Sequence, residues 1–155
     1  MQKSIRRGLE EDALFWATEL YLSGYATQAW RRLCIIASED IGLAYSEVFL
    51  VVRELYKAWA EIKTIDEAKL HFIHAVLQLV RSPKSRIVDH ALITFFEGPR
   101  EKKTIPDWAL DIHTGRGRAL GRGQQHFFEV GTKLNNIILR DDYAVRAKKI
   151  RGKKT

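Results

Sequence analysis

The segment whose residue types are best suited to binding or catalysis lies between residues 111 and 126. Arginines alternate there with glycines, beside two histidines and an aspartate: Asp111, His113, Arg116, Arg118, Arg122 and His126. Glycine allows the backbone to approach a ligand closely, and a guanidinium can donate two parallel hydrogen bonds to a phosphate group. The pattern therefore favours contact with a phosphate or with the backbone of a nucleic acid.

Two other interpretations of this segment stay open. In one, it is a flexible basic connector whose histidine and arginines pair with Asp107, Asp111 or Glu129. In the other, it belongs to a phosphate- or nucleotide-handling module, in which Asp111 orients His113 as a general base, His126 is a second acid and the arginines clamp a phosphoryl group. The glycine spacing matches neither the Walker loop nor the dinucleotide fingerprint, and no nucleophile is evident. We therefore predict no catalytic residue, cofactor or metal site.

Positive charge is concentrated in the last third of the chain. Residues 100–155 carry 14 Lys and Arg against 6 Asp and Glu, whereas residues 1–99 carry 12 against 13. Such a basic region attracts polyanions, so the expected partner is a DNA or RNA backbone. Sequence-specific reading of bases is not expected, because no helix-turn-helix or finger motif is visible. The candidate nucleic-acid or phosphate contacts are His113, Arg116, Arg118, Arg122, Lys148, Lys149 and Arg151.

Composition limits the cellular compartment and the number of domains. A chain of 155 residues is large enough for one hydrophobic core. Its one cysteine, Cys34, excludes an internal disulfide and fits a reducing compartment. The basic first residues are not followed by an apolar leader segment, and no stretch approaches the roughly 20 apolar residues of a membrane span. We predict a cytoplasmic protein without a membrane partner.

Apolar residues recur every three or four positions through the first ninety-odd residues, which predicts helices rather than strands. The expected helices cover about residues 9–23, 27–41, 45–59, 65–81 and 85–97. Thr64 and Glu67 have the spacing of a capping box at the start of the fourth. In the fifth, Val88, Ala91, Leu92 and Phe95 share a face that is expected to be buried.

The remaining third should begin with a charged linker at residues 99–104, followed by a short helix carrying Trp108, Leu110 and Ile112. Four glycines within residues 115–123 argue against a rigid helix there. A last amphipathic helix is expected over residues 124–139, followed by a basic, mobile tail. The predicted fold is an all-α bundle of about six or seven helices with a basic, Gly/Arg-rich C-terminal segment. Its expected parts are a helical domain (1–98), an extension packing on it (99–139) and the tail (140–155).

One sequence motif resembles a known family. The segment 31–44, Arg-Arg-Leu-Cys-Ile-Ile-Ala-Ser-Glu-Asp-Ile-Gly-Leu-Ala, resembles the C-terminal region of the MgsA/RarA family of clamp-loader-like AAA+ proteins, relatives of the Werner helicase-interacting protein. Residues 3–6 and 12–16 resemble the family's entry into this region, and residues 82–85 resemble its Pro-Lys-Ser turn. The family-motif residues are Ser38, Glu39, Asp40, Gly42, Pro83, Lys84 and Ser85.

The resemblance implies a helical domain that follows an ATPase core, holds the protein in a homotetramer, and serves replication-fork maintenance and recombination. We therefore expect a non-catalytic homo-oligomer, a dimer or tetramer, with a separate AAA+ ATPase as a further partner. Arg86 stands where the family pattern has a polar Asn, and residues 99–155 are expected to depart from the pattern. ATP hydrolysis does not carry over, because the chain lacks a Gly-x-x-x-x-Gly-Lys-Ser/Thr loop.

The adjacent carboxylates of Glu39 and Asp40 have two interpretations. They could hold a cation or the basic groups of a partner. They could instead form the charged end of the second helix, packed beside a turn at Gly42 and stabilising the junction with the third helix. We favour the structural interpretation, because sites assigned from a single sequence often fail.

Overall fold

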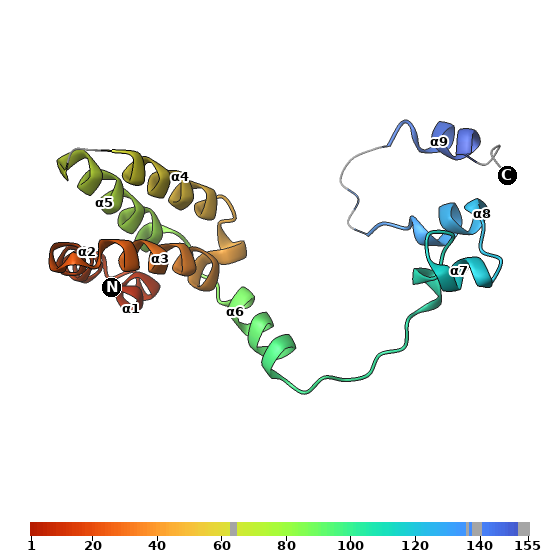
Figure 1. Ribbon diagram of the computed structural model, residues 1–155, viewed down its shortest axis with the longest axis horizontal. Coiled ribbons are helices and arrows are strands. Elements are labelled where there is room, and N and C mark those ends of the chain that lie inside the picture. Colours follow the sequence, from red (N-terminus) through yellow and green to blue (C-terminus); the bar gives the residue numbers. More distant parts are fainter. Residues whose placement is uncertain (63–64, 136, 138–140, 152–155) are drawn as a thin grey trace. The chain divides into compact units, whose positions relative to one another are not determined.

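The computed structural model describes residues 1–62, 65–135, 137 and 141–151, which divide between two compact units. The N-terminal unit is Met1–Arg100 and the C-terminal unit is Glu101–Thr155. Every regular element in the described part is helical, which confirms the predicted all-α class (Figure 1). The predicted cap residue Thr64, part of the predicted last helix and the end of the tail lie outside the described residues. The packing of residues 99–139 on residues 1–98 stays a prediction.

The N-terminal unit consists of helices that follow one another closely along the chain. Three short segments with wide helical turns extend α2, α3 and α6, and a 3-10 turn follows the second of them. The elements are α1 (Gln2–Arg7), α2 (Glu10–Leu20), η1 (Tyr21–Tyr25), α3 (Ala26–Ile36), η2 (Ala37–Ile41), η3 (Gly42–Ala44), α4 (Val48–Glu61), α5 (Ile65–Arg81), α6 (Ile87–Leu92) and η4 (Ile93–Glu97). All five predicted helices are present, and α1 is an additional helix. The fourth, over 65–81, has its predicted bounds as α5, whereas the other four have shifted ends.

The hydrophobic core of this unit is built around Trp30. Its indole is fully buried, and its ring centre lies 5.6 Å from that of Tyr56, 5.8 Å from that of Trp59 and 5.5 Å from that of Phe72. These residues come from α3, α4 and α5, so one aromatic cluster holds the three helices together. Ile5 from α1 completes the core, which explains why the short first helix is held in place.

Helix α6 corrects the sequence-based prediction. Val88, Ala91, Leu92 and Phe95 were expected to be buried, but all four are exposed, Leu92 at 51% and Phe95 at 74%. Figure 1 shows α6 running away from the bundle formed by α1 to α5. Only its first residues approach the bundle, where Val88 Cγ2 lies so close to Gly42 that a Cβ on Gly42 would be 2.9 Å away. The helix therefore presents an apolar face that its own unit leaves uncovered.

The C-terminal unit contains η5 (Asp107–Ala109), α7 (Gly115–Ala119), α8 (Gln124–His126), η6 (Phe127–Gly131) and α9 (Ala144–Arg151). The predicted helix around Trp108 is a single 3-10 turn. The predicted last helix is α8 with η6, and it ends at Gly131 instead of continuing through Asn135, because glycine disfavours helix and the Thr132 hydroxyl donates to the Phe128 carbonyl. In the described residues, no helix is long and apolar enough to cross a membrane.

The glycine-rich stretch also differs from its prediction, because it forms helix α7. Thr114 caps the helix: its Oγ1 accepts from the Gly117 amide at 3.0 Å and donates to the Asp111 carbonyl at 3.0 Å. Gly117 is buried against the Asp111 backbone, where a Cβ would lie 1.9 Å from the carbonyl oxygen. Glycine is needed at this position for close packing rather than for flexibility.

Candidate functional site

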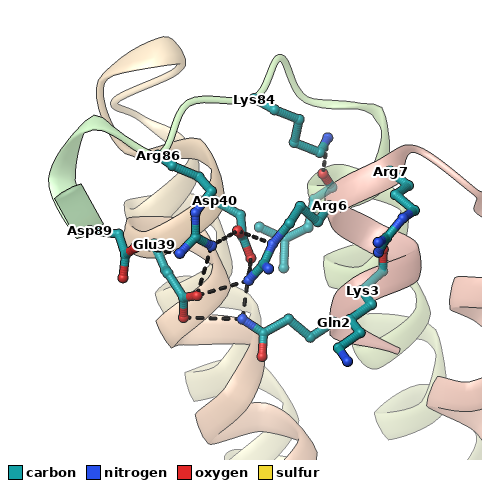
Figure 2. Close-up of polar contacts among 10 residues, drawn as sticks. Gln2, Lys3, Arg6, Arg7, Glu39, Asp40, Lys84, Arg86 and Asp89 are labelled. Carbon is teal, nitrogen blue, oxygen red and sulfur yellow. Dashed lines mark hydrogen bonds and ion pairs between the residues drawn. The ribbon is translucent and has the colours of Figure 1, made fainter.

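The two carboxylates of the family motif lie in an ion-pair network (Figure 2). Arg6 donates from Nε to Asp40 Oδ1 at 2.6 Å and from Nη2 to Glu39 Oε1 at 2.8 Å. Arg86 donates from Nη1 to the same two oxygens, at 2.9 Å and 3.0 Å. Asp40 is completely buried, while both arginines keep about a third of their side chains exposed. One buried charge is therefore shared between two cations from distant parts of the chain.

Further contacts extend this network at both ends. Gln2 Nε2 donates to Glu39 Oε2 at 3.1 Å and to Asp40 Oδ2 at 3.3 Å, and Arg86 Nη2 pairs with Asp89. The Ser85 amide donates to the main-chain carbonyl of Asp40 at 2.9 Å. The network thus joins α1, η2 and the start of α6. Because the chain's own arginines occupy the carboxylates, these contacts favour the structural interpretation of the motif.

The Pro-Lys-Ser turn caps the end of α5. Lys84 Nζ donates to the carbonyls of Leu79 and Val80, each at 2.9 Å, and to the carbonyl of Ser82. These are carbonyls that a helix end leaves without partners, so the lysine takes the place of the missing next turn. Burial lowers the pKa of the Lys84 ammonium, while the charge of nearby Asp40 raises it. Ser38, by contrast, is exposed to solvent.

In the C-terminal unit, several of the predicted phosphate-binding groups are bound within the unit. Arg122 Nη2 pairs with Asp107 Oδ1, and Arg118 Nη1 donates to the Ile112 carbonyl at 3.1 Å. His113 Nδ1 lies 3.2 Å from Asp111 Oδ2. Two of these contacts, Arg122 with Asp107 and His113 with Asp111, are pairs that the connector interpretation expected, whereas the contact of Arg118 with a main-chain carbonyl is not. Of the predicted cationic contacts, the side chains of Arg116, Lys148, Lys149 and Arg151 make no hydrogen bond or ion pair with a described residue, and all four are exposed.

The histidines of the catalytic interpretation lie in two separate sets of contacts. Asp111 holds His113 as that interpretation expected, and the His113 ring packs 4.6 Å from the ring of Phe127. His126 instead lies near Asp107, with 4.0 Å between Nε2 and Oδ2. Among the contacts of the described residues, none joins the two sets. His113 therefore has an orienting carboxylate, but the second acid of the proposed pair has a different neighbour.

We expect Asp111 to make the C-terminal unit sensitive to acid. The hydrogen bond from the His113 side chain, followed by that from the His113 amide, lowers the pKa of Asp111 below its ordinary value. A lowered folded pKa stabilises the unit fully above the ordinary value of about 3.9, and this stabilisation is lost as the pH falls through the folded pKa. Amide shifts of residues 111–117, followed by NMR, should therefore change in this acid range.

The matched control for this titration is Asp111→Asn, which keeps the shape but removes the carboxylate. The variant should be less ordered than the natural chain near neutral pH, and the difference should shrink as the pH falls through the lowered folded pKa of Asp111. An identical acid transition in both proteins would show that Asp111 does not hold this loop.

The contacts above define an all-helical domain in which a Glu-Asp junction and a Pro-Lys-Ser turn meet through Arg86 and the Ser85 amide. The family model described as "MgsA AAA+ ATPase C terminal" matches residues 9–150, and the chain belongs to this family. The predicted family resemblance is confirmed. The match reaches residue 150, so the expectation that residues 99–155 depart from the family pattern was wrong.

Individual relatives agree with the family match. The chain is 34% identical over 126 residues to "Replication-associated recombination protein A" of Bacillus subtilis, covering 79% of this chain and 29% of that protein. It is 32% identical over 125 residues to an uncharacterized AAA domain-containing protein of Mycobacterium tuberculosis, covering 79% and 27%. A Haemophilus influenzae protein, also named Replication-associated recombination protein A, is 28% identical over 132 residues, covering 81% and 29%. The chain thus spans less than a third of each relative.

Proposed function

We propose that this chain is a non-catalytic assembly domain that associates with itself and contacts nucleic-acid backbone, in support of DNA replication and recombination. Two of the relatives are named for replication-associated recombination, which supports this context. The matching family model is that of an AAA+ ATPase, which supports the further partner that we propose, a separate AAA+ ATPase. The cytoplasm remains the predicted compartment.

The observation that carries the assembly proposal is the uncovered apolar face of α6 and η4. Its large apolar side chains are all at least 37% exposed, and the two phenylalanines are exposed at 74% and 76%. The face consists of Ile87, Val88, Leu92, Ile93, Phe95 and Phe96. Soluble proteins rarely leave so many large apolar side chains of one short segment in water, because burying them is favourable. A second copy of the chain would cover it.

Light scattering on the purified chain tests the assembly proposal. A molar mass of two or four times 17.9 kDa at tens of micromolar supports it. A single species of 17.9 kDa at every concentration would remove it.

The nucleic-acid proposal is supported by the charge of the C-terminal unit. Residues 101–155 carry 13 Lys and Arg against 6 Asp and Glu, whereas residues 1–100 carry 13 of each. The exposed cations Arg116, Lys148, Lys149 and Arg151 are the groups best placed to contact phosphate, since no described residue neutralises them. Binding of this kind releases counterions from the nucleic acid and weakens steeply with salt.

We expect affinity for DNA or RNA to fall with salt, and to fall less steeply when Arg116, Lys148, Lys149 and Arg151 are replaced together by Ala. Each lost phosphate contact should reduce the slope of log affinity against log salt by about 0.7 to 0.9. Fluorescence anisotropy across a salt series measures this slope. Lys57→Ala, an exposed lysine of the N-terminal unit paired with Glu54, is the control and should leave the slope unchanged. If neither DNA nor RNA binds at low salt, this part of the proposal is wrong.

The second candidate function is a phosphate- or nucleotide-handling module. The observation that favours it is the Asp111–His113 pair, which is the arrangement a general base requires. It ranks second because Arg118 and Arg122 are bound to groups of their own unit and would have to leave them to clamp a phosphoryl group.

A further inference from the structure

Arg86 holds two elements with the two terminal nitrogens of one guanidinium (Figure 2). Nη1 donates to Asp40 Oδ1 at 2.9 Å and to Glu39 Oε1 at 3.0 Å, and both carboxylates belong to η2. Nη2 pairs with Asp89, in the first turn of α6. Because a guanidinium is planar and rigid, groups bound to its two ends are fixed in direction relative to each other. The side chain therefore bridges the bundle and α6.

Apolar packing contributes little to holding α6 on the bundle. The helix packs against η2 and η3, where the Val88 side chain approaches Gly42. Residues 83–86, which connect α6 to α5, have no regular secondary structure. Most of the large apolar side chains of α6 and η4 are exposed, so they do not fix the helix to its own unit. The polar contacts at the start of α6 must therefore set its direction.

The direction of α6 matters for self-association. Two copies that meet through the apolar face of α6 and η4 bring those helices together in one geometry. A helix that samples many directions holds that geometry for only part of the time, and the apparent affinity falls by the same fraction. A contact that fixes the helix before the copies meet therefore strengthens association without touching the second copy.

We propose that Arg86 is a positioning residue for self-association. By bridging Glu39 and Asp40 to Asp89, it fixes the direction of α6 and so presents the apolar face of α6 and η4 to a second copy of the chain. This inference rests on the proposed self-association and adds the group that controls it.

The direction of α6 can be measured without assembly, in the full chain carrying Leu92→Glu and Phe95→Glu. Residual dipolar couplings measured by NMR for the amides of α6 and of α3 should fit one common orientation. Arg86→Lys, added to this chain, keeps the positive charge but has a single ammonium, which cannot hold both sides in the same geometry. The couplings of α6 should then shrink relative to those of α3, because the helix samples several directions.

The effect on assembly is measured in the chain that keeps Leu92 and Phe95. Arg86→Lys and Asp89→Ala should each raise the dissociation constant roughly tenfold, as expected if α6 holds the competent direction for about a tenth of the time. Light scattering across a dilution series measures this constant. Unfolding of Asp89→Ala, followed by tryptophan fluorescence, should keep the natural midpoint, because Trp30 and the bundle are not disturbed.

Asp66→Ala is the matched control. It breaks the ion pair of Asp66 with Lys69, which has the same spacing of three residues and lies in the first turn of α5. The variant should leave both the direction of α6 and the dissociation constant unchanged.

The two measurements separate this inference from the proposal beneath it. If α6 keeps its orientation in Arg86→Lys, or if Arg86→Lys and Asp89→Ala assemble as tightly as the natural chain, the positioning role is wrong while self-association stands. A natural chain that stays monomeric at tens of micromolar overturns self-association itself, and with it any role of Arg86 in assembly. If Arg86→Lys unfolds the bundle, Asp89→Ala decides by both measurements.

Discussion

Asp40→Ala is expected to lower the free energy of unfolding of the N-terminal unit by roughly 2 to 4 kcal/mol. Removing one member of a buried ion pair typically costs about 3 to 5 kcal/mol, because the remaining charge loses its partner. The lower range applies because Arg6 and Arg86 each keep about a third of the side chain exposed and can be partly hydrated. Denaturant unfolding followed by tryptophan fluorescence measures the change, since Trp30 lies in the core of the same unit.

Two further variants show whether the loss of stability comes from the burial of Asp40 or would follow from breaking any ion pair. Asp40→Asn keeps the shape and some hydrogen bonding, so it should lose less stability than Asp40→Ala. Arg81→Ala breaks the exposed ion pair with Glu10 and should leave the unfolding midpoint almost unchanged. If Asp40→Ala unfolded at the same denaturant concentration as Arg81→Ala, the network would not be what holds α1, η2 and α6 together.

Replacing Leu92 and Phe95 together by Glu should convert the assembled chain into monomers. Both side chains are more than half exposed on the apolar face of α6 and η4, so the substitutions do not disturb the core. An interface hot spot contributes about 2 kcal/mol or more, so each change should weaken association roughly thirtyfold or more. Molar mass measured across a dilution series should fall to 17.9 kDa where the natural chain remains assembled.

Leu22→Glu is the control for this experiment. Leu22 is 69% exposed in η1, outside the α6 and η4 face, so the substitution adds the same charge at a different surface. We expect this variant to remain assembled. Loss of assembly in Leu22→Glu as well, or an unchanged mass in the Leu92/Phe95 variant, would contradict the assignment of the interface.

The helices of the N-terminal unit were predictable because their apolar spacing is local information. The exposure of the α6 face could not be predicted, although the apolar spacing of α6 is equally clear. The pattern of Leu92 and Phe95 shows that this face prefers an apolar neighbour, but it does not say whether the neighbour belongs to the same unit. The sequence-based prediction assigned the neighbour to the same bundle, and the structure leaves the face open.

The candidate site was predictable only in part, because its partners are distant in the chain. Glu39 and Asp40 stood out as adjacent carboxylates, but Arg6 and Arg86 lie 34 and 46 residues from Asp40, and no local pattern links them. Gly117 misled the prediction for the opposite reason. Glycine composition indicates flexibility on average, whereas this glycine is required by the close approach of the Asp111 backbone.

Hydrogen–deuterium exchange of residues 87–97, measured on concentrated and on diluted protein, tests the central claim most directly. If the apolar face of α6 and η4 is where copies of the chain meet, these amides should exchange slowly in concentrated solution and become fast on dilution, while the amides around Trp30 stay protected at both concentrations. Exchange of residues 87–97 at the same rate in both solutions would contradict it.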